Sequence, residues 1–386
     1  MKYTIKSILQ AVSVAIFFLF FTVLLLVLLA LPKQKVSETE NKELATFPKF
    51  SLSSLTSGSF MQGFDRYISD HFPGRPWWIG TKTEMELSLG KKEISGVYVL
   101  KNRLVLQVKE PDPAIVNDSV AAIGAFAERH AATPVQLMLV PTAQEIYRSE
   151  LPENAPAANQ ANFIDDVYQR LKRSKVLGVD VMNTLSSAKS EPIYFRTDHH
   201  WTPLGAYYGY SAFIKQSGAG ASAIPLSSFD VEHVSDDFLG TLHSKTLYTG
   251  VEPDSISFYH MPEGASVLSV KAQGKDGIVE RDSLYFRENL ETKDQYAAFL
   301  GGNYSRVDIT TDAKSENRLL IIKDSYANAM IPFLTQHYRE ITLLDPRYFN
   351  TRYAELVDVD SYSQVLFLYN VSTFMEDTSI RKLGAE

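Results

Sequence analysis

Apolar segments of strand length alternate with segments of helical period along most of the chain, and this alternation restricts the fold more than any other feature. Helical period is clear in AIVNDSVAAIGAFAERHAA and NFIDDVYQRLKRS, and further helices are expected from about Tyr326 to His337 and near residues 350–356. Strand-like segments are PVQLMLV (134–140), VDVM (179–182), RLLIIK (318–323), EITLLD (340–345) and SQVLFLY (363–369). Such alternation predicts βαβ units, and therefore an α/β fold with a mainly parallel sheet.

The alternation stops between residues 217 and about 300, where Gly, Ser, Pro and acidic residues are frequent. Short strand candidates occur there at SISFYH and ASVLSVKA, and we interpret the region as an insertion. GAGASA, at residues 218–223, matches a dinucleotide-binding fingerprint in its glycine spacing, but it follows a helix and no strand leads into it. It is therefore interpreted as a linker, and no cofactor is predicted.

The amino-terminal region predicts a membrane anchor. From Ala11 to Leu31 only Ser13 and Thr22 interrupt an apolar stretch that is long enough, as a helix, to cross a hydrocarbon layer of ~30 Å. A cleaved signal peptide is the alternative, but its apolar region is usually shorter and is followed by a small-residue cleavage site. We expect residues 1–10 in the cytoplasm and the rest of the chain outside it, although lysines flank the stretch on both sides.

Three further parts are expected along the chain, after the anchor at residues 11–31. Residues 32–60 are polar without a sustained period, which is typical of a juxtamembrane stalk. A helix is predicted through MQGFDRYISDHF and two short strands at GVYVL and RLVLQV. Residues 61–386 are then expected to form the catalytic domain, with the insertion at about 217–300.

Charge and cysteine content exclude several classes of function. The formal net charge of -7 leaves no excess of basic residues to neutralise a phosphate backbone, so nucleic-acid binding is not expected. Cysteine is absent, which excludes disulfides, thiolate nucleophiles and thiolate metal ligands. Any covalent chemistry must therefore use another nucleophile.

The stretch TDHHW places an acid and two imidazoles directly before a predicted helix that starts at Thr202 and Pro203. If this loop is extended, Asp198 and His200 point to the same side and His199 points away. A carboxylate beside a histidine can hold the ring's tautomer and stabilise its charged form, as in a nucleophile–base–acid triad. The alternative for an isolated D-x-H is an exposed acid with a histidine packed on Trp201.

A metal site formed by Asp198, His199 and His200 is a second alternative for the same stretch. Three adjacent residues rarely converge on one ion, and no other segment shows ligand spacing. We therefore predict no metal.

The best candidate nucleophile is Ser325, in RLLIIKDSYANAMIPFL. It falls between a predicted strand and a predicted helix, where backbone N–H groups can face a developing oxyanion. Ligands of α/β proteins also bind at the carboxyl ends of parallel strands. The alternative is that the hydroxyl only caps the helix. The G-x-S-x-G motif of lipase-like hydrolases is absent.

Two other segments offer polar groups for such a site. Gly301 and Gly302, followed by Asn303 in AFLGGNYSRVDI, allow close backbone approach and an amide donor, although the same residues are typical of a turn. Arg347, in LLDPRYF, follows the next predicted strand and is a candidate for binding a negatively charged substrate group, with a surface ion pair as the alternative.

Taken together, these segments resemble the bacterial DHHW protein family, relatives of the alginate O-acetyltransferase group within the SGNH-hydrolase-like superfamily. The resemblance rests on ENKELATFPKFS, FDRYISDHFPGR, GVYVLKNRLVL, TDHHW, DDFLGTLHSKT and KDSYANAMIPFL followed by LDPRYF. It implies a three-layer αβα domain behind the amino-terminal transmembrane helix. It also implies that Asp198, His200 and Ser325 form the catalytic triad. It identifies no oxyanion residue, and Gly302, Asn303 and Asn328 are our candidates for that site.

The resemblance further implies O-acetylation of a cell-surface or exported polysaccharide, through an acyl-enzyme intermediate. A polytopic membrane acyltransferase is the implied partner that supplies acetyl groups. Two rival functions remain open: a carbohydrate O-acetylesterase with the same triad, and a non-catalytic surface module that binds glycans.

Overall fold

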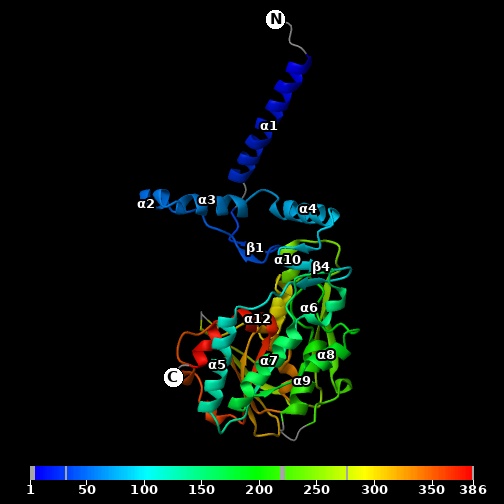
Figure 1. The fold of residues 1–386 in the computed structure, drawn as a ribbon, viewed down its shortest axis with the longest axis vertical. Coiled ribbons are helices and arrows are strands. Elements are labelled where there is room, and N and C mark those ends of the chain that lie inside the picture. The colour runs from blue at the N-terminus through cyan, green and yellow to red at the C-terminus, as the bar shows by residue number, and fades with distance from the viewer. Residues whose placement is uncertain (1–4, 31–32, 218–221, 275–276, 385–386) are drawn as a thin grey trace. The chain divides into compact units, whose positions relative to one another are not determined.

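The structure is a computed structural model that describes residues 5–30, 33–217, 222–274 and 277–384. The chain divides into two compact units, one formed by residues 1–91 and 246–249 and the other by residues 92–245 and 250–386 (Figure 1). Leu31 and most of the GAGASA linker lie outside the described residues.

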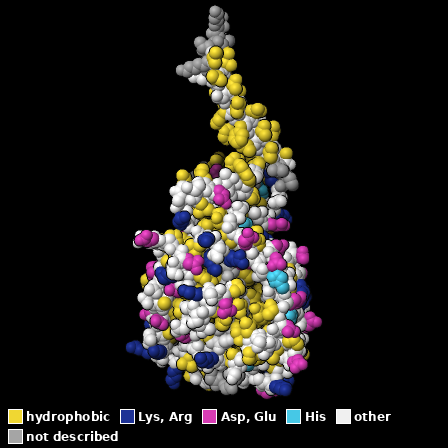
Figure 2. Space-filling view, turned by 90° about the vertical axis from the view of Figure 1, so that its right-hand side faces the viewer, with side chains coloured by type: hydrophobic (Ala, Val, Ile, Leu, Met, Phe, Trp, Pro, Cys, Tyr) yellow, Lys and Arg dark blue, Asp and Glu magenta, His cyan; other side chains and the backbone are white. Residues whose placement is uncertain are grey.

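The smaller unit begins with one long apolar helix, α1 (Ile5–Ala30). Its segment Ser7–Leu28 has a mean hydropathy of 3.0 and is the one helix in the described part of the chain that is long and apolar enough to cross a membrane. Apolar side chains cover its surface (Figure 2).

Short elements follow α1, both in the segment expected to be a juxtamembrane stalk, residues 32–60, and after it. β1 (Val36–Ser37) and β2 (Lys42–Glu43) pair antiparallel, and α2 (Leu52–Thr56) precedes α3 (Ser59–Asp70) and α4 (Arg75–Ser88). Ser51 starts α2 because its side chain and that of Ser54 each accept a hydrogen bond from the other's backbone N–H. The predicted domain boundary at residue 61 also differs from the division in the structure, because α3 and α4 belong to the smaller unit.

An eight-stranded sheet forms the centre of the larger unit. Its order is β11-β10-β12-β14-β13-β15-β6-β7, and the pairs from β14 to β7 are parallel. The strands are β6 (Val135–Val140), β7 (Leu177–Gly178), β10 (Val267–Gly274), β11 (Gly277–Arg281), β12 (Arg306–Thr311), β13 (Arg318–Lys323), β14 (Glu340–Leu344) and β15 (Gln364–Asn370). The predicted α/β class with a mainly parallel sheet is confirmed.

Helices cover both faces of this sheet, as Figure 1 shows. On one face, α5 (Pro113–Arg129), α7 (Gln160–Leu171) and α12 (Val371–Glu376) pack with Leu320 and Ile322 of β13 in one core. On the other, α9 (Pro203–Gln216) and α11 (Ile331–Leu334) pack with Leu319 and Ile321 in a second core. Successive side chains of a strand point to opposite faces, so the predicted three-layer arrangement is confirmed.

Smaller elements lie outside the main sheet. Three short strands, β3 (Glu93–Ile94), β4 (Val97–Val99) and β5 (Leu104–Leu106), form a separate sheet. β8 (Asp230–Phe238) pairs with β9 (Asp254–His260) inside the predicted insertion. The remaining short helices are α6 (Ala143–Ile146), α8 (Met182–Ser187) and α10 (Thr241–Thr246).

Part of the predicted insertion belongs to the main sheet instead of lying apart from it. β10 pairs antiparallel with β12, and β11 pairs with β10, so the two strands extend one edge of the sheet. The segment 217–300 lacks the alternation because antiparallel neighbours need no crossover helix between them.

Three predicted elements are shorter than expected. The helix expected from Tyr326 is a 3₁₀ turn, η6 (Ser325–Ala329), followed by the short α11, because Pro332 cannot continue a helix that began earlier. The helix expected near residues 350–356 is the single 3₁₀ turn η7 (Tyr353–Glu355). In place of the strand expected over 179–182 the structure has the two-residue β7 (Leu177–Gly178), and Met182, whose N–H donates to the Asp180 carboxylate, already belongs to α8.

Candidate active site

The TDHHW loop is fixed to the rest of the larger unit through Trp201. Thr202 and Pro203 start α9 as predicted, and the Thr202 hydroxyl accepts a hydrogen bond from Gly205 N–H. The indole of Trp201 is fully buried, and its Nε1 donates to the backbone oxygen of Tyr326 at 2.9 Å. Because Tyr326 follows Ser325, this bond ties the histidine loop directly to the turn that carries the candidate nucleophile.

The structure brings Asp198, His200 and Ser325 together in one hydrogen-bonded chain. Asp198 Oδ1 lies 2.6 Å from His200 Nδ1, and His200 Nε2 lies 2.7 Å from Ser325 Oγ. A carboxylate only accepts, so Nδ1 carries the proton and Nε2 is left to accept from the serine hydroxyl. Asp198 and His200 are buried, whereas Ser325 is partly exposed, so the open end of the chain is the hydroxyl.

The second oxygen of Asp198 is held by Thr241, at the start of α10. Thr241 donates to Asp198 Oδ2 from its backbone N–H at 2.7 Å and from its hydroxyl at 2.8 Å. Burial alone raises the pKa of Asp198, but the adjacent His199 and His200 and these hydrogen bonds hold that pKa well below its usual range. The carboxylate therefore stays ionised wherever the protein is folded at ordinary pH.

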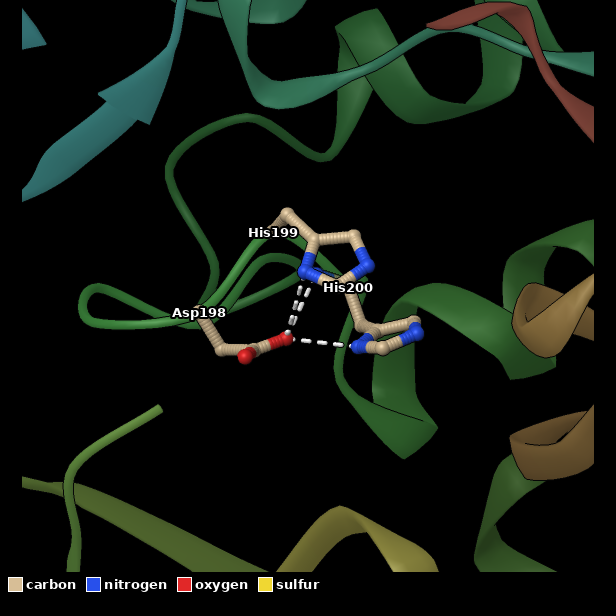
Figure 3. A group of neighbouring side chains, drawn as sticks. All are labelled: Asp198, His199 and His200. Carbon is tan, nitrogen blue, oxygen red and sulfur yellow. Dashed lines mark hydrogen bonds and ion pairs between the residues drawn. The ribbon is translucent and has the colours of Figure 1, made fainter. Parts of the chain in front are cut away.

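His199 does not point away from Asp198 and His200 as predicted: its ring centroid lies 3.9 Å from that of His200, and its Nδ1 lies 3.5 Å from Asp198 Oδ1 (Figure 3). The Thr241 hydroxyl gives its proton to Asp198, so it accepts from His199 Nδ1, which lies 2.7 Å away. Burial, together with the neighbouring His200, lowers the pKa of His199 to about 3. The His199 ring is therefore neutral and directs its proton to Thr241 and not to the serine.

The same three side chains place ligand atoms within 4.8 Å of one another, which is a distance that a metal ion could bridge. Their atoms already form bonds, however: His200 joins Asp198 to Ser325, and His199 donates to Thr241. Coordination would have to break this chain of hydrogen bonds. The donor set is thus arranged for proton transfer.

Asp198 packs directly against Gly240, where only a residue without a side chain fits. A Cβ at position 240 would lie 2.3 Å from the Asp198 Cβ and 2.5 Å from its Oδ2, far inside van der Waals contact. We expect Gly240→Ala to displace the carboxylate and to lower kcat by about 10²-fold, since a shift of ~1 Å in a reacting group costs that much.

Steady-state kinetics with an acetyl ester would check this prediction. Gly80→Ala is the matched control, because a Cβ there meets its nearest neighbour, Leu247 O, only at 3.4 Å. Unchanged kcat in Gly240→Ala would show that the position of Asp198 is not limiting.

Ser325 stands at the carboxyl end of β13, at the first position of η6. The carboxylate of Asp324 caps this turn by accepting from Tyr326 N–H at 2.9 Å, and it also accepts from the backbone N–H and the side-chain amide of Asn370, at the end of β15. Two neighbouring parallel strands therefore fix the backbone around the hydroxyl. This edge of the sheet is where α/β proteins bind ligands.

Tyr296 packs against the His200 ring, and the sequence did not predict this contact. Its ring stacks on the His200 ring with centroids 3.7 Å apart and planes 8° apart, and its hydroxyl donates to Ser325 O at 3.1 Å. Tyr296 follows Asp294 on a short 3₁₀ turn, η5 (Gln295–Ala298). No local pattern marks this tyrosine, because it reaches the site from the irregular segment before β12.

Lys323, a buried residue two positions before Ser325, fixes the candidate oxyanion residues. Its Nζ donates to Asn328 Oδ1 at 2.7 Å and to Asn303 Oδ1 at 3.1 Å, and Asn328 Nδ2 donates to Gly302 O. The amide of Asn328 is thus committed to Lys323 and Gly302. Since lysine only donates, Asn303 turns its Nδ2 away from Lys323.

The loop before Asn303 has positive φ angles, as its two glycines suggest. Leu300, Gly301 and Gly302 have φ values of 62°, 75° and 105°. Glycine adopts such angles without steric cost, whereas Leu300 does so only because it is held by its surroundings. This loop brings Asn303 to Lys323.

Burial gives Lys323 a pH-dependent effect on stability. Desolvation lowers its pKa from 10.5 to about 8, with Arg347 contributing and Asp345 and Asp324 opposing. Between these two values the unfolded chain binds a proton that the folded chain has lost, so stability rises with pH in this window. We expect the free energy of unfolding of the wild type to increase, relative to Lys323→Met, from about pH 8 to about pH 10.5.

Urea unfolding at several pH values would measure this difference. Loss of the amide partners should destabilise Lys323→Met by a pH-independent amount of about 1–3 kcal/mol, so the slope against pH is the decisive quantity. Lys189→Met, at an exposed lysine, corrects for the loss of a lysine as such. Parallel curves for wild type and Lys323→Met would contradict the prediction.

Arg347 is paired within the protein. Its guanidinium binds the buried carboxylate of Asp345 through two hydrogen bonds, at 2.9 and 2.6 Å. These bonds and the nearby Asp324 keep the pKa of Arg347 above its usual range despite the opposing effect of burial. Arg347 therefore neutralises Asp345, and this ion pair is not at the surface as the alternative expected, because Asp345 is fully buried.

Comparison with known proteins gives one family and several related structures. The family model described as "DHHW protein" matches residues 92–344. A crystal structure of a DHHW family protein from Eubacterium siraeum superposes with a TM-score of 0.62 at 25% identity, covering 74% of this chain and 96% of that one. Bacillus cereus PatB1, solved with a sulfonyl adduct, superposes with a TM-score of 0.60 at 20% identity over 73% and 98% of the two chains.

Among curated sequences, the chain is similar to the "Probable alginate O-acetylase AlgJ" of Pseudomonas fluorescens. The match is 24% identical over 163 residues, which are 40% of this chain and 41% of that one. The chain thus matches about two fifths of the length of the curated relative.

Proposed function

The chain belongs to the DHHW protein family, and from this premise we propose that it is an O-acetyltransferase that acts on hydroxyls of a cell-surface or exported polysaccharide. The observation that carries the proposal is the hydrogen-bonded chain from Asp198 through His200 to Ser325, with distances of 2.6 and 2.7 Å. The similarity to an alginate O-acetylase supports the choice of acyl group and acceptor.

In the first half-reaction, Ser325 takes the acetyl group from a donor ester. His200 Nε2 accepts the hydroxyl proton while Oγ bonds to the acyl carbon. Asp198 stabilises the positive ring that results. The tetrahedral intermediate then collapses, the bond to the donor oxygen breaks, and that oxygen leaves with the proton from His200.

In the second half-reaction, a sugar hydroxyl takes the place of the donor. Its proton passes to His200 Nε2 as its oxygen bonds to the acetyl carbon, and Ser325 Oγ leaves and regains that proton. Both intermediates carry a negative oxygen. Its donors are proposed to be the backbone N–H of Ser325, at the start of η6, and the Nδ2 group of Asn303, which Lys323 orients.

We further propose that α1 is a single membrane-spanning anchor and that the larger unit lies outside the cytoplasm. The composition and length of Ser7–Leu28 support this placement. A polytopic membrane acyltransferase would then supply acetyl groups at the outer face of the membrane. That partner is inferred from the family resemblance.

Intact-mass analysis tests the proposed chemistry. The full-length protein in detergent, incubated with a chromogenic acetyl ester, should gain about 42 Da as an acetyl-serine intermediate. A polysaccharide without acetyl groups should then accelerate the release of chromophore and carry the acetyl label.

The partition of the label separates the proposed function from its rivals. Free acetate as the only product, with no effect of added polysaccharide, would identify an esterase. An unmodified protein that still binds polysaccharide would identify a binding module.

A further inference from the structure

The smaller unit exposes large apolar side chains that its own core does not cover. α2 and α3 contain no buried residue, and α4 contains only Thr83. The exposed large apolar side chains in residues 33–91 are Val36, Phe47, Phe50, Leu52, Leu55, Met61, Trp77, Trp78, Met85 and Leu89. Large apolar groups grouped in this way usually mark an interaction site.

The sequence of α3 separates apolar from polar residues around the helix. At 100° per residue, its five large apolar side chains fall within an arc of about 120°; they are Phe60, Met61, Phe64, Tyr67 and Ile68. Phe47 packs on this arc, with its ring centroid 5.2 Å from Tyr67, and Phe50 lies 5.4 Å from Phe60. Phe47 and Phe50 are themselves 56% and 67% exposed. The side chains that cover the apolar side of α3 therefore also present apolar surface to the solvent.

α4 carries a second exposed stripe. Trp78, Met85 and Leu89 are spaced by seven and four residues, which places them on one side of the helix. Trp77 contacts Trp78 with ring centroids 4.6 Å apart, and its side chain is 63% exposed. Tryptophans with an apolar body and a polar N–H are typical of the boundary between lipid and water.

The charges of residues 33–91 and the nearby end of α1 favour lipid over a charged protein as the partner of these apolar side chains. Residues 33–91 contain eight Lys or Arg and seven Asp or Glu, and several of these charges are paired within the unit, as in Lys42–Asp70 and Arg75–Glu40. The segment therefore offers little net charge for a charged partner. The end of α1 is also close by, since Lys33 Nζ lies 6.0 Å from the Tyr67 ring.

We propose that the exposed apolar side chains of Phe47, Phe50, Leu52, Trp77 and Trp78 lie in the head-group boundary of the bilayer that α1 crosses. The inference rests on the proposed anchoring of α1 and goes beyond it, because a transmembrane helix alone does not place the following helices in the membrane. Amphipathic helices of this kind insert ~5–10 Å into the boundary.

The natural tryptophans provide a probe for α4. The protein has three, and the third, Trp201, is fully buried in the larger unit. The full-length protein is reconstituted in phosphatidylcholine vesicles made with plain or brominated acyl chains, and flotation with the vesicles confirms insertion. We expect bromine near the head-group end of the chains to quench most of the wild-type emission, and bromine near the terminal methyl to quench it less.

The variant Trp77→Phe/Trp78→Phe, which retains only Trp201, should show equal emission in both kinds of vesicle. Equal emission of the wild type in plain and brominated vesicles would overturn the proposal. An emission shifted to shorter wavelength but insensitive to bromine would also overturn it, because a second protein chain would then cover the tryptophans. Failure of the full chain to float would overturn the anchor and the surface together.

Single cysteines test α2 independently, since the chain has none of its own. Leu52→Cys and its matched control Leu268→Cys replace exposed leucines, one in each unit. Each thiol receives an environment-sensitive fluorophore in vesicles that contain nitroxide-labelled lipid. We expect strong quenching at position 52 and none at position 268, whereas equal quenching at the two positions would contradict the proposed seating of α2.

Discussion

Replacement of Ser325 by Ala should abolish acetyl transfer while leaving the fold intact. The Ser325 hydroxyl lies 2.7 Å from His200 Nε2, at the open end of the hydrogen-bonded chain. Without it no acyl-enzyme can form, and we expect kcat to fall by at least ~10⁴-fold, as is usual when the nucleophile of a triad is removed. The acetyl adduct should be absent from the mass spectrum of Ser325→Ala under conditions that label the wild type.

Ser187→Ala is the matched control for this experiment, because it removes an exposed hydroxyl on α8. The melting temperature of Ser325→Ala should remain within about 2 °C of the wild type, since the lost hydroxyl is partly exposed. An adduct that persists in Ser325→Ala would assign the nucleophile to another residue.

Replacement of Asp198 by Asn should cost about 10⁴-fold in kcat, the usual effect of placing a triad histidine in the wrong tautomer. Both carboxylate oxygens accept from more than one donor: Thr241 binds Oδ2, and His200 binds Oδ1 through its ring and its backbone N–H. An amide NH₂ placed against Nδ1 of His200 forces the proton onto Nε2. That nitrogen can then no longer accept from Ser325.

Asp254→Asn provides the comparison for this prediction. Asp254 accepts from the backbone N–H groups of Arg196 and Thr197 and so supports the same loop without touching His200. We expect both variants to be destabilised in urea, because each leaves buried donors poorly satisfied, but kcat to fall far more in Asp198→Asn. Similar kcat values would mean that Asp198 acts only by holding the loop.

The strands, the start of α9 and the candidate residues Asp198, His200 and Ser325 were within reach of the sequence because their signals are local. β13 and β15 are continuous apolar runs between polar turns, as expected of strands covered on both faces. Thr202 and Pro203 locate the start of α9, so they also locate the loop before it. Ser325 follows β13, but the TDHHW loop follows α8 and no strand of the main sheet, so only the family resemblance implied that the two would meet.

The groups that tune the site could not be predicted in the same way. Thr241, Tyr296 and Lys323 contact Asp198, His200 and the candidate oxyanion amides, respectively, from distant segments. Only the folded chain reveals these contacts, because a buried threonine, tyrosine or lysine has no local pattern that distinguishes it. The helix expected from Tyr326 to His337 failed for a different reason: Pro332 lies in the first turn of α11 and separates it from η6, against the surrounding hydrophobic period.

The order of strands in the sheet has a consequence for biosynthesis. β6 emerges early from the ribosome, but its neighbour β15 is among the last segments made. Val135 of β6 can therefore pair with Val365 of β15 only late in synthesis. Until then one edge of a fully buried, apolar strand has no partner, which favours aggregation. β15 also separates β6 from β13, so a chain truncated before Gln364 would lack the strand that joins the two halves of the sheet. Folding of the larger unit should therefore begin only after synthesis is nearly complete, and before then Ser325 is an ordinary, unreactive serine.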